Sequence, residues 1–189
     1  MRSILTTVAA FLLASNALAA PKPPAHAAAK ASEIDRLFAT LSQVDNDEEA
    51  KPIEDKIMAA FLRSGSPTVD LLMSRAGAAL EAKDAGTANK LLASVNDIAP
   101  DFAEAWHQRG VLQAESGDDE GSMFCLQKAV ALNPRNFEAI AELGTQLEEY
   151  GDKSGALKLY RKAMALDPHY DGIAHKVREL TQEVEGESL

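Results

Sequence analysis

Apolar residues recur with helical spacing along most of the chain, from about residue 32 to residue 183. One stripe consists of Ile34, Leu37, Phe38 and Leu41, and a second of Ile53, Ile57, Phe61 and Leu62. Steps of three and four residues place such side chains on one face of an α-helix. No stretch alternates apolar and polar residues as a half-buried strand does. The pattern therefore predicts an all-α protein that begins with a helical pair over residues 32–68.

A second periodicity repeats this pattern at a step of 34 residues. The aligned positions are Ala76, Gly110 and Gly144; Ala88, Ser122 and Ala156; Leu92, Leu126 and Tyr160; Val95, Ala129 and Ala163; and Pro100, Pro134 and Pro168. Self-similarity at such a period is typical of a solenoid, in which one structural unit stacks on the next.

The repeated positions have a physical explanation in pairs of helices. A small residue such as Gly144 permits two helices to cross closely, and a large one such as Tyr160 fills the space beside the crossing. Gly151 is suited to end the first helix and Asp152 to cap the second. Pro168 stops the second helix at the residue before it. The sequence thus predicts helix, turn, helix within each 34-residue unit.

These units resemble the tetratricopeptide repeat (TPR), in which two antiparallel helices fill 34 residues. Residues 137–170 match its pattern at Ile140, Leu143, Gly144, Leu147, Ala156, Tyr160, Ala163 and Pro168. Residues 103–136 match at Trp106, Gly110, Ala129 and Pro134, with Arg109 in place of the family's leucine, and residues 69–102 match more loosely. The resemblance implies a right-handed superhelix of three repeats, with atypical helices at both ends.

The end segments depart from the repeat. Counted back by 34, Ser42 and Glu54 replace the small residues, so residues 32–68 are either a degenerate repeat or an N-terminal cap. Apolar residues at helical spacing in residues 171–183 predict a C-terminal helix that covers the last repeat. Residues 184–189 are expected to form a disordered tail.

The first 31 residues carry a different signal. Arg2 precedes an apolar run, and the run is followed by Ala17-Leu18-Ala19. This pattern predicts a signal peptide over residues 1–19, cleaved after Ala19. The run is shorter than the ~20 apolar residues of a membrane span, so an uncleaved anchor is the weaker alternative. Residues 20–31 are rich in proline and alanine and are expected to form a flexible tether. We therefore expect a periplasmic or secreted bacterial protein.

The composition of the chain argues against one class of partner and against an internal disulfide. The formal net charge of -10 argues against nucleic acid as a partner, because nucleic-acid binding needs a basic face. The single cysteine, Cys125, excludes an internal disulfide.

No motif for catalysis or metal binding is present. The four histidines are His26, His107, His169 and His175, and none forms an HExxH motif or a pair at i, i+4. The acidic stretch 45–49 lacks the glycine of a calcium loop, since Ala50 stands there, and is better explained as a helix start. Cys125 falls within an amphipathic helix and is interpreted as an inert, buried thiol. We expect a non-catalytic protein with no cofactor and no metal site.

The family resemblance implies a concave groove lined by the first helix of each repeat. The groove residues that it indicates are Asp70, Met73, Leu80, Glu81, Glu104, His107, Val111, Glu115, Glu138, Thr145, Glu148 and Glu149. Acids dominate these positions and no lysine or arginine occurs there, which argues against a clamp for a C-terminal carboxylate. The alternative is an ordinary solvated surface. It explains poorly why Glu81, Glu115 and Glu149 stand at helix C-termini, where the helix dipole disfavours them.

These observations predict an adaptor or scaffold that binds a protein or peptide segment, with basic residues, in an acidic groove. One alternative is a self-assembling structural subunit of an envelope complex. Another is a carrier of small cationic ligands. A stable membrane span is not expected after cleavage of the signal peptide.

Overall fold

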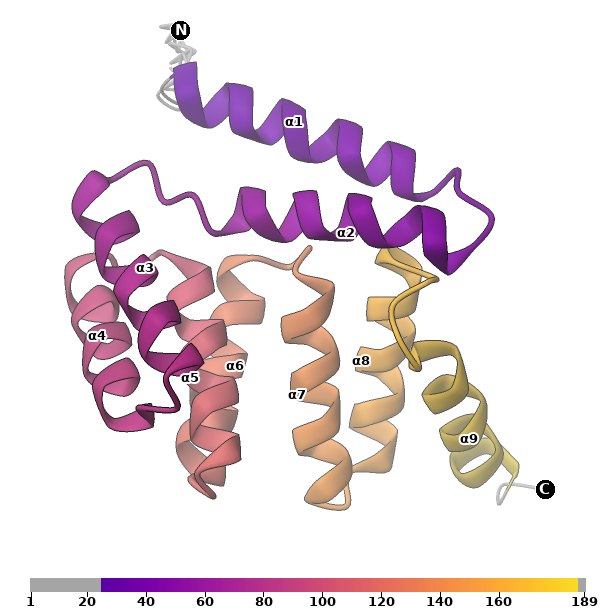
Figure 1. Ribbon diagram of the computed structural model, residues 1–189. Helices are drawn as coiled ribbons and strands as arrows, with labels where there is room; N and C mark the ends of the chain where they lie inside the picture. The colour runs from indigo at the N-terminus through magenta and orange to yellow at the C-terminus, as the bar shows by residue number, and fades with distance from the viewer. Residues whose placement is uncertain (1–24, 187–189) are drawn as a thin grey trace, which may run out of the picture.

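The computed structural model describes residues 25–186, which over that range form nine α-helices and no strand (Figure 1). The helices are α1 (Ala25–Leu41), α2 (Asp47–Phe61), α3 (Pro67–Glu81), α4 (Ala85–Ile98), α5 (Ala103–Glu115), α6 (Asp119–Leu132), α7 (Phe137–Glu149), α8 (Lys153–Leu166) and α9 (Ile173–Gly186). The predicted all-α fold is therefore confirmed. The predicted signal peptide, residues 1–19, lies outside the described residues.

Helices α3 to α8 form three antiparallel pairs, which stand side by side in Figure 1. In the second and third pairs the chain turns through glycines with left-handed backbone, Gly117 (φ +79°) and Gly151 (φ +84°). The first pair has Lys83 at this position, with φ +58°, although side chains disfavour that region. Asp118 and Asp152 accept hydrogen bonds from the N–H groups three residues later and so cap α6 and α8. The turns and caps thus follow the sequence pattern.

The small residues of the repeat lie where the two helices of a pair touch. A Cβ added at Gly144 would come within 2.8 Å of the Tyr160 ring, and one at Gly110 within 2.8 Å of the Leu126 side chain. Tyr160 and Leu126 are themselves almost fully buried. A larger residue at these crossings would push the helices apart, because the space is already filled.

We expect Gly144→Ala to lower the free energy of unfolding by about 1–3 kcal/mol, because the added methyl group overpacks against Tyr160. The same substitution at Gly77, which is helical but has no atom within 4 Å of an added Cβ, should raise it by about 0.5–1 kcal/mol. Urea unfolding followed by circular dichroism compares the two variants. A Gly144→Ala chain as stable as the parent would contradict the close crossing.

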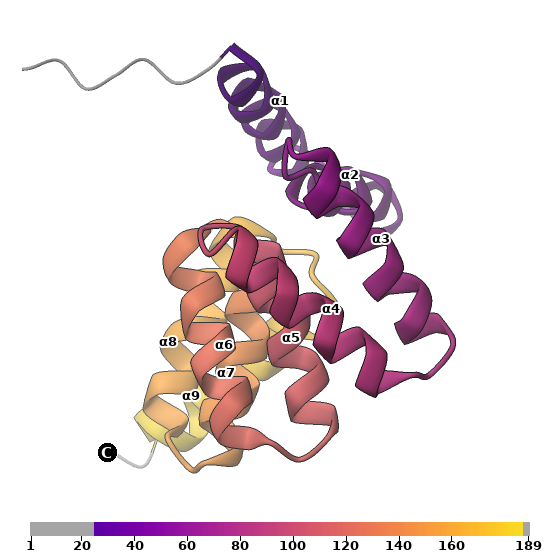
Figure 2. The ribbon, with the colours of Figure 1, turned by 90° about the vertical axis from the view of Figure 1, so that its left-hand side faces the viewer.

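The N-terminal helices do not continue this stack. α1 and α2 run crosswise over one end of the other helices (Figures 1 and 2). There they pack on the turns that join one pair to the next. The Phe38 ring makes an edge contact with Phe137 at 6.3 Å, and the Arg135 guanidinium lies 4.2 Å from the centre of the Phe38 ring. Asp47 bonds the His169 imidazole at 2.9 Å. Of the two alternatives for residues 32–68, the structure therefore favours a cap over a degenerate repeat.

Two buried carboxyl groups also join α2 to this end. Glu54 and Asp167 are 6% and 0% exposed, and they lie close enough to act on each other's pKa. Burial raises the pKa of both acids, because it disfavours their charged forms. Lys51 lies 3.4 Å from Glu54 and balances part of the remaining charge. The N-terminal cap is thus held by ring contacts and ion pairs.

The crosswise position of the cap leaves one face of α3 open. Leu71 is 53% exposed, whereas Ala105 and Ala139, which occupy the same repeat position in α5 and α7, are fully buried. Arg75 and Ala78 on α3 are exposed as well. Burial at these positions depends on the preceding helix pair, and α3 has none stacked against it.

The predicted tether is too long. α1 begins at Ala25, so residues 25–31 are helical rather than part of a tether over residues 20–31. Five of these seven residues are alanine, which has the highest helix propensity. The sequence analysis took small side chains as a sign of flexibility and overlooked that propensity. Residues 20–24 lie outside the described part of the chain.

The predicted C-terminal tail is also too long. α9 continues to Gly186, so residues 184–186 belong to this helix. Val184 packs against the same apolar cluster as the rest of α9. The stripe that contains Val177 and Leu180 therefore extends one turn further than predicted.

Candidate functional site

The groove residues predicted from the sequence lie on α3, α5 and α7, on what we call the α3–α5–α7 face, in three different environments. Asp70, Glu81, Glu115 and Glu149 are exposed; Leu80, Val111, Glu138, Thr145 and Glu148 are half-buried; Met73, Glu104 and His107 are buried. Several of them are committed to partners within the chain, so the available site is smaller than predicted.

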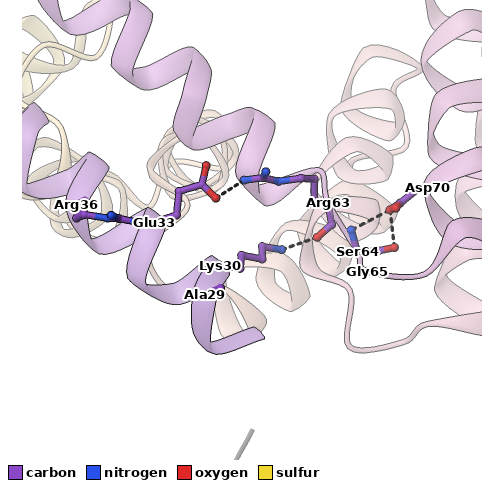
Figure 3. A pocket seen from close by; sticks show the side chains of 8 residues that line it. All are labelled: Ala29, Lys30, Glu33, Arg36, Arg63, Ser64, Gly65 and Asp70. Atoms are coloured by element: carbon purple, nitrogen blue, oxygen red, sulfur yellow. Dashed lines mark hydrogen bonds and ion pairs between the residues drawn. The ribbon is translucent and has the colours of Figure 1, made fainter. Parts of the chain in front are cut away.

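Asp70 fastens the turn between α2 and α3. Its Oδ1 accepts hydrogen bonds from the Ser64 N–H at 2.9 Å and from the Ser64 Oγ at 2.6 Å. Figure 3 shows these bonds beside a hollow of about 650 Å³, where Lys30 donates to the Arg63 carbonyl and Arg63 pairs with Glu33. The polar groups here bind one another. We therefore interpret this hollow as the junction that holds α1 against the turn, and Asp70 as structural.

Glu104 and His107 form a buried cluster with Asn136. Asn136 Nδ2 donates to Glu104 Oε2 at 3.2 Å, and His107 Nδ1 lies 3.4 Å from Glu104 Oε1. Asn136 also caps α7, because its Oδ1 accepts from the Ala139 N–H. Burial alone would lower the pKa of His107, but the hydrogen bond and charge of Glu104 raise it. Glu104 and His107 thus join α5 to the start of α7, and their burial leaves little of either side chain for a partner.

Glu148 is likewise engaged. The Tyr160 hydroxyl donates to Glu148 Oε2 at 2.7 Å, and Lys176 Nζ on α9 lies 2.9 Å from the same oxygen. These partners lower the pKa of Glu148 against the effect of its burial. Thr145 lies 3.1 Å from the Tyr160 hydroxyl and belongs to the same network. Glu148 therefore anchors the C-terminal helix rather than facing open solvent.

Among the acids of α5 and α7, four form no ion pair with a described residue: Glu115, Glu138, Glu142 and Glu149. Burial raises the pKa of both Glu138 and Glu142, and His107 partly opposes it. The charges of Glu115 and Glu149 raise the pKa of Glu142 further, which shows that the acids of α5 and α7 lie within electrostatic reach. The acidic character is thus concentrated on α5 and α7.

Glu142 was missed in the sequence analysis. It occupies the sixth position of its repeat, and the family resemblance draws attention to other positions. A glutamate between Ala141 and Leu143, both of which are buried, was the available signal. Its neighbours hold it close to the protein interior.

An apolar floor lies beside the acids, on α3 and α5. One hollow of about 440 Å³ is lined by Leu62, Arg63, Asp70, Met73, Ser74, Gly77 and Gln108. Met73 is buried at its base, while Leu80 and Val111 are half-buried on the same helices. Glu81 is exposed at the end of α3. Apolar and acidic surface thus lie along one face.

Nothing in residues 25–186 forms a group of three or more His, Cys, Asp or Glu side chains able to hold a metal ion. None of the described helices is long and apolar enough to cross a membrane. Cys125 is buried, with Sγ 3.0 Å from Gln113 Oε1, and burial raises the pKa of its thiol. Such a thiol is a poor nucleophile.

We expect the melting temperature to fall as the pH rises from 5 to 8. The pKa values of Glu54, Glu138, Glu142, Asp167 and His107 are all raised in the folded chain. Stability from such groups is present below the unfolded pKa, about 4 for the acids and about 6.5 for histidine, and is lost as the pH rises through the folded pKa. The lowered pKa of Glu148 acts in the opposite direction, but below about pH 4.5.

Thermal unfolding at fixed ionic strength measures this dependence. Asp167→Asn should flatten the profile, because a neutral amide replaces one of the two buried acids. Asp97→Asn, at an exposed position on α4, is the matched control and should leave the slope unchanged. A melting temperature that rises between pH 5 and pH 8 would contradict the expectation.

Comparison with known sequences identifies the repeat. A sequence model of the tetratricopeptide repeat matches residues 103–136, which are the second predicted 34-residue unit. A TPR repeat-containing protein of Rhizobium etli is 31% identical over 114 residues, which cover 60% of this chain and 56% of that protein. The matched region therefore spans little more than half the length of this curated relative.

Solved structures show the same fold. The Sgt2 TPR domain from Aspergillus fumigatus superimposes with a TM-score of 0.58 and 22% identity, covering 65% of this chain and 83% of that chain. The first TPR of Spaghetti (RPAP3), bound to an HSP90 peptide, superimposes with a TM-score of 0.58 and 16% identity, covering 62% and 93%. The predicted repeat architecture is confirmed by these likenesses.

Proposed function

The chain belongs to the tetratricopeptide-repeat proteins, and from that premise we propose that it is a non-catalytic adaptor that binds a basic segment of a partner protein. TPR solenoids present extended surfaces to proteins and peptides, and the Spaghetti neighbour holds a peptide. In this chain the segment would lie along the α3–α5–α7 face.

The observation that carries this proposal is the set of carboxylates without ion pairs on that face. Lys176 is already paired with Glu148, so it does not balance the charge of the four carboxylates Glu115, Glu138, Glu142 and Glu149. A partner with lysine or arginine residues balances this charge. Each exposed contact contributes only about 0.2–1 kcal/mol, so several must act together. The apolar floor around Met73 then supplies contacts that do not depend on salt.

Self-assembly into a structural subunit is the second candidate, because one observation favours it. The open face of α3, with Leu71 53% exposed, could receive another helix. The opposite end does not match it, since Arg178, Glu179 and Gln182 are exposed on α9. Head-to-tail stacking would place this polar surface on the α3 face, which favours the adaptor. A carrier of small cations ranks third, because the carboxylates without ion pairs are spread over two helices rather than gathered at one point.

Capture from a periplasmic extract, followed by kinetics with the purified partner, tests the proposal. Glu115→Gln with Glu149→Gln should slow association several-fold and weaken its salt dependence, because exposed charges act mainly through steering. Asp97→Asn with Glu120→Gln removes the same charge from α4 and α6 and should behave like the parent chain. A partner whose association is indifferent to salt and to the first pair of substitutions would contradict the acidic face.

We also propose that the protein is exported and begins at Ala20 after cleavage. Arg2, the apolar run and Ala17-Leu18-Ala19 support this proposal. Mass spectrometry of the intact protein from a cell-envelope fraction should give the mass of residues 20–189. Ala19→Arg should block cleavage, because a large charged residue cannot enter a site that accepts small ones. Retention of Met1 in the exported protein would show that the segment is not a cleaved signal.

A further inference from the structure

A small cavity lies between α7, α8 and the turn into α9. Its volume is about 280 Å³, and its lining includes Glu142, Thr145, Tyr160, Tyr170, Asp171 and Lys176. Small-molecule sites begin at roughly 300 Å³, so this cavity suits a single side chain rather than a helix. It opens on the acidic part of the α3–α5–α7 face, since Glu142 belongs to both.

Glu142 lies in this cavity without a partner. It is half-buried, and burial raises its pKa; the charge of His107 partly opposes this, and the charges of Glu149 and Glu115 raise the pKa further. No hydrogen bond or ion pair joins its carboxylate to another described residue, and Asp171 beside the cavity adds a second negative charge. A carboxylate withdrawn from water with only partial compensation lowers stability. Groups kept at such a cost often belong to binding sites.

The chain itself shows how this cavity accommodates an ammonium group. Lys176 Nζ lies 5.9 Å from the centre of the Tyr160 ring and 2.9 Å from Glu148 Oε2. That arrangement combines a cation–π contact with an ion pair. Tyr170 and Glu142 provide a second aromatic ring and a second carboxylate in the same cavity, and no described lysine or arginine forms an ion pair with this carboxylate.

Tyr170 is held in place by stacked rings. Its ring packs on Phe137 at 5.4 Å, and Phe137 contacts Phe38 of α1 at 6.3 Å. Burial and the charges of Glu138 and Glu142 raise the pKa of Tyr170 above its usual range, so the phenol stays neutral. A fixed aromatic ring beside an unpaired carboxylate is a preformed environment for a cation.

We propose that this cavity binds one lysine or arginine side chain of the partner segment, with its charge on Glu142 and Asp171 and its alkyl stem against Tyr170. The inference rests on the proposed function and names the residue type that the partner must present. Charge complementarity favours a basic side chain as the occupant. An acidic side chain would be repelled by Glu142 and Asp171, and an apolar side chain would leave both carboxylates unpaired.

The probe is the capped pentapeptide acetyl-Gly-Gly-Lys-Gly-Gly-amide, titrated into the isotope-labelled full chain and followed by amide chemical shifts. Shifts should concentrate on residues 141–145 and 170–176. The peptide with norleucine in place of lysine keeps the stem and lacks the charge, so it should bind at least tenfold more weakly. An arginine peptide should behave like the lysine peptide.

Variants separate the cavity from general electrostatics. Glu142→Gln should weaken the lysine peptide about tenfold, and Asp171→Asn, at an exposed turn position, should weaken it two- to threefold. Asp97→Asn, which removes one charge from the far side of the pairs, should have no effect. Tyr170→Phe keeps the ring and should bind within twofold of the parent chain. Glu142→Gln should also raise the melting temperature at pH 8, which verifies that the variant folds.

Equal binding of the lysine and norleucine peptides, or unchanged binding in both Glu142→Gln and Asp171→Asn, overturns the proposal. If Glu115→Gln with Glu149→Gln slows association of a captured partner and Glu142→Gln does not, the adaptor proposal stands and the cavity proposal is rejected. If none of these three substitutions changes association of the partner, the proposal of an acidic adaptor face is rejected as well.

Discussion

The close approach of the two helices within each pair is the constraint on which the rest of the structure depends. At Gly144 a single added carbon would meet the Tyr160 ring at 2.8 Å, so the ring packs there only because residue 144 has no side chain. From that position its hydroxyl reaches Glu148, and Glu148 in turn binds Lys176 of α9. A packing requirement inside the third pair thereby fixes the C-terminal helix and one wall of the candidate site.

The N-terminal cap extends this order to the other end of the helices. Phe38, Phe137 and Tyr170 form a row of rings that runs from α1 through the start of α7 to the turn before α9. Because Tyr170 also lines the cavity beside Glu142, the cap helps to shape the surface offered to a partner. The same crosswise position leaves Leu71 on α3 open, so α1 and α2 support the last repeat rather than the first.

The acids of the α3–α5–α7 face divide into two kinds. Glu104 and Glu148 are bound by Asn136, Tyr160 and Lys176, and they connect one helix to another. Glu138 and Glu142 are half-buried with no such partner, and their raised pKa values record that burial opposes their charge. Groups of the first kind stabilise the fold, while groups of the second kind weaken it, and the proposed cationic side chain of a partner would offset that cost.

The sequence by itself determined the helices, their pairing, and the caps such as Asp118 and Asp152, because these features arise from periodicity and from contacts within one 34-residue unit. It placed the ends of α1 and α9 wrongly, where alanine propensity and one more apolar residue extend a helix. Tertiary structure alone decided that Asp35 meets Arg135, which lies 100 residues away. It also decided which acids are bound and which stay open. A repeat position specifies a face of a helix, but what covers that face depends on distant segments whose pairing no local pattern encodes.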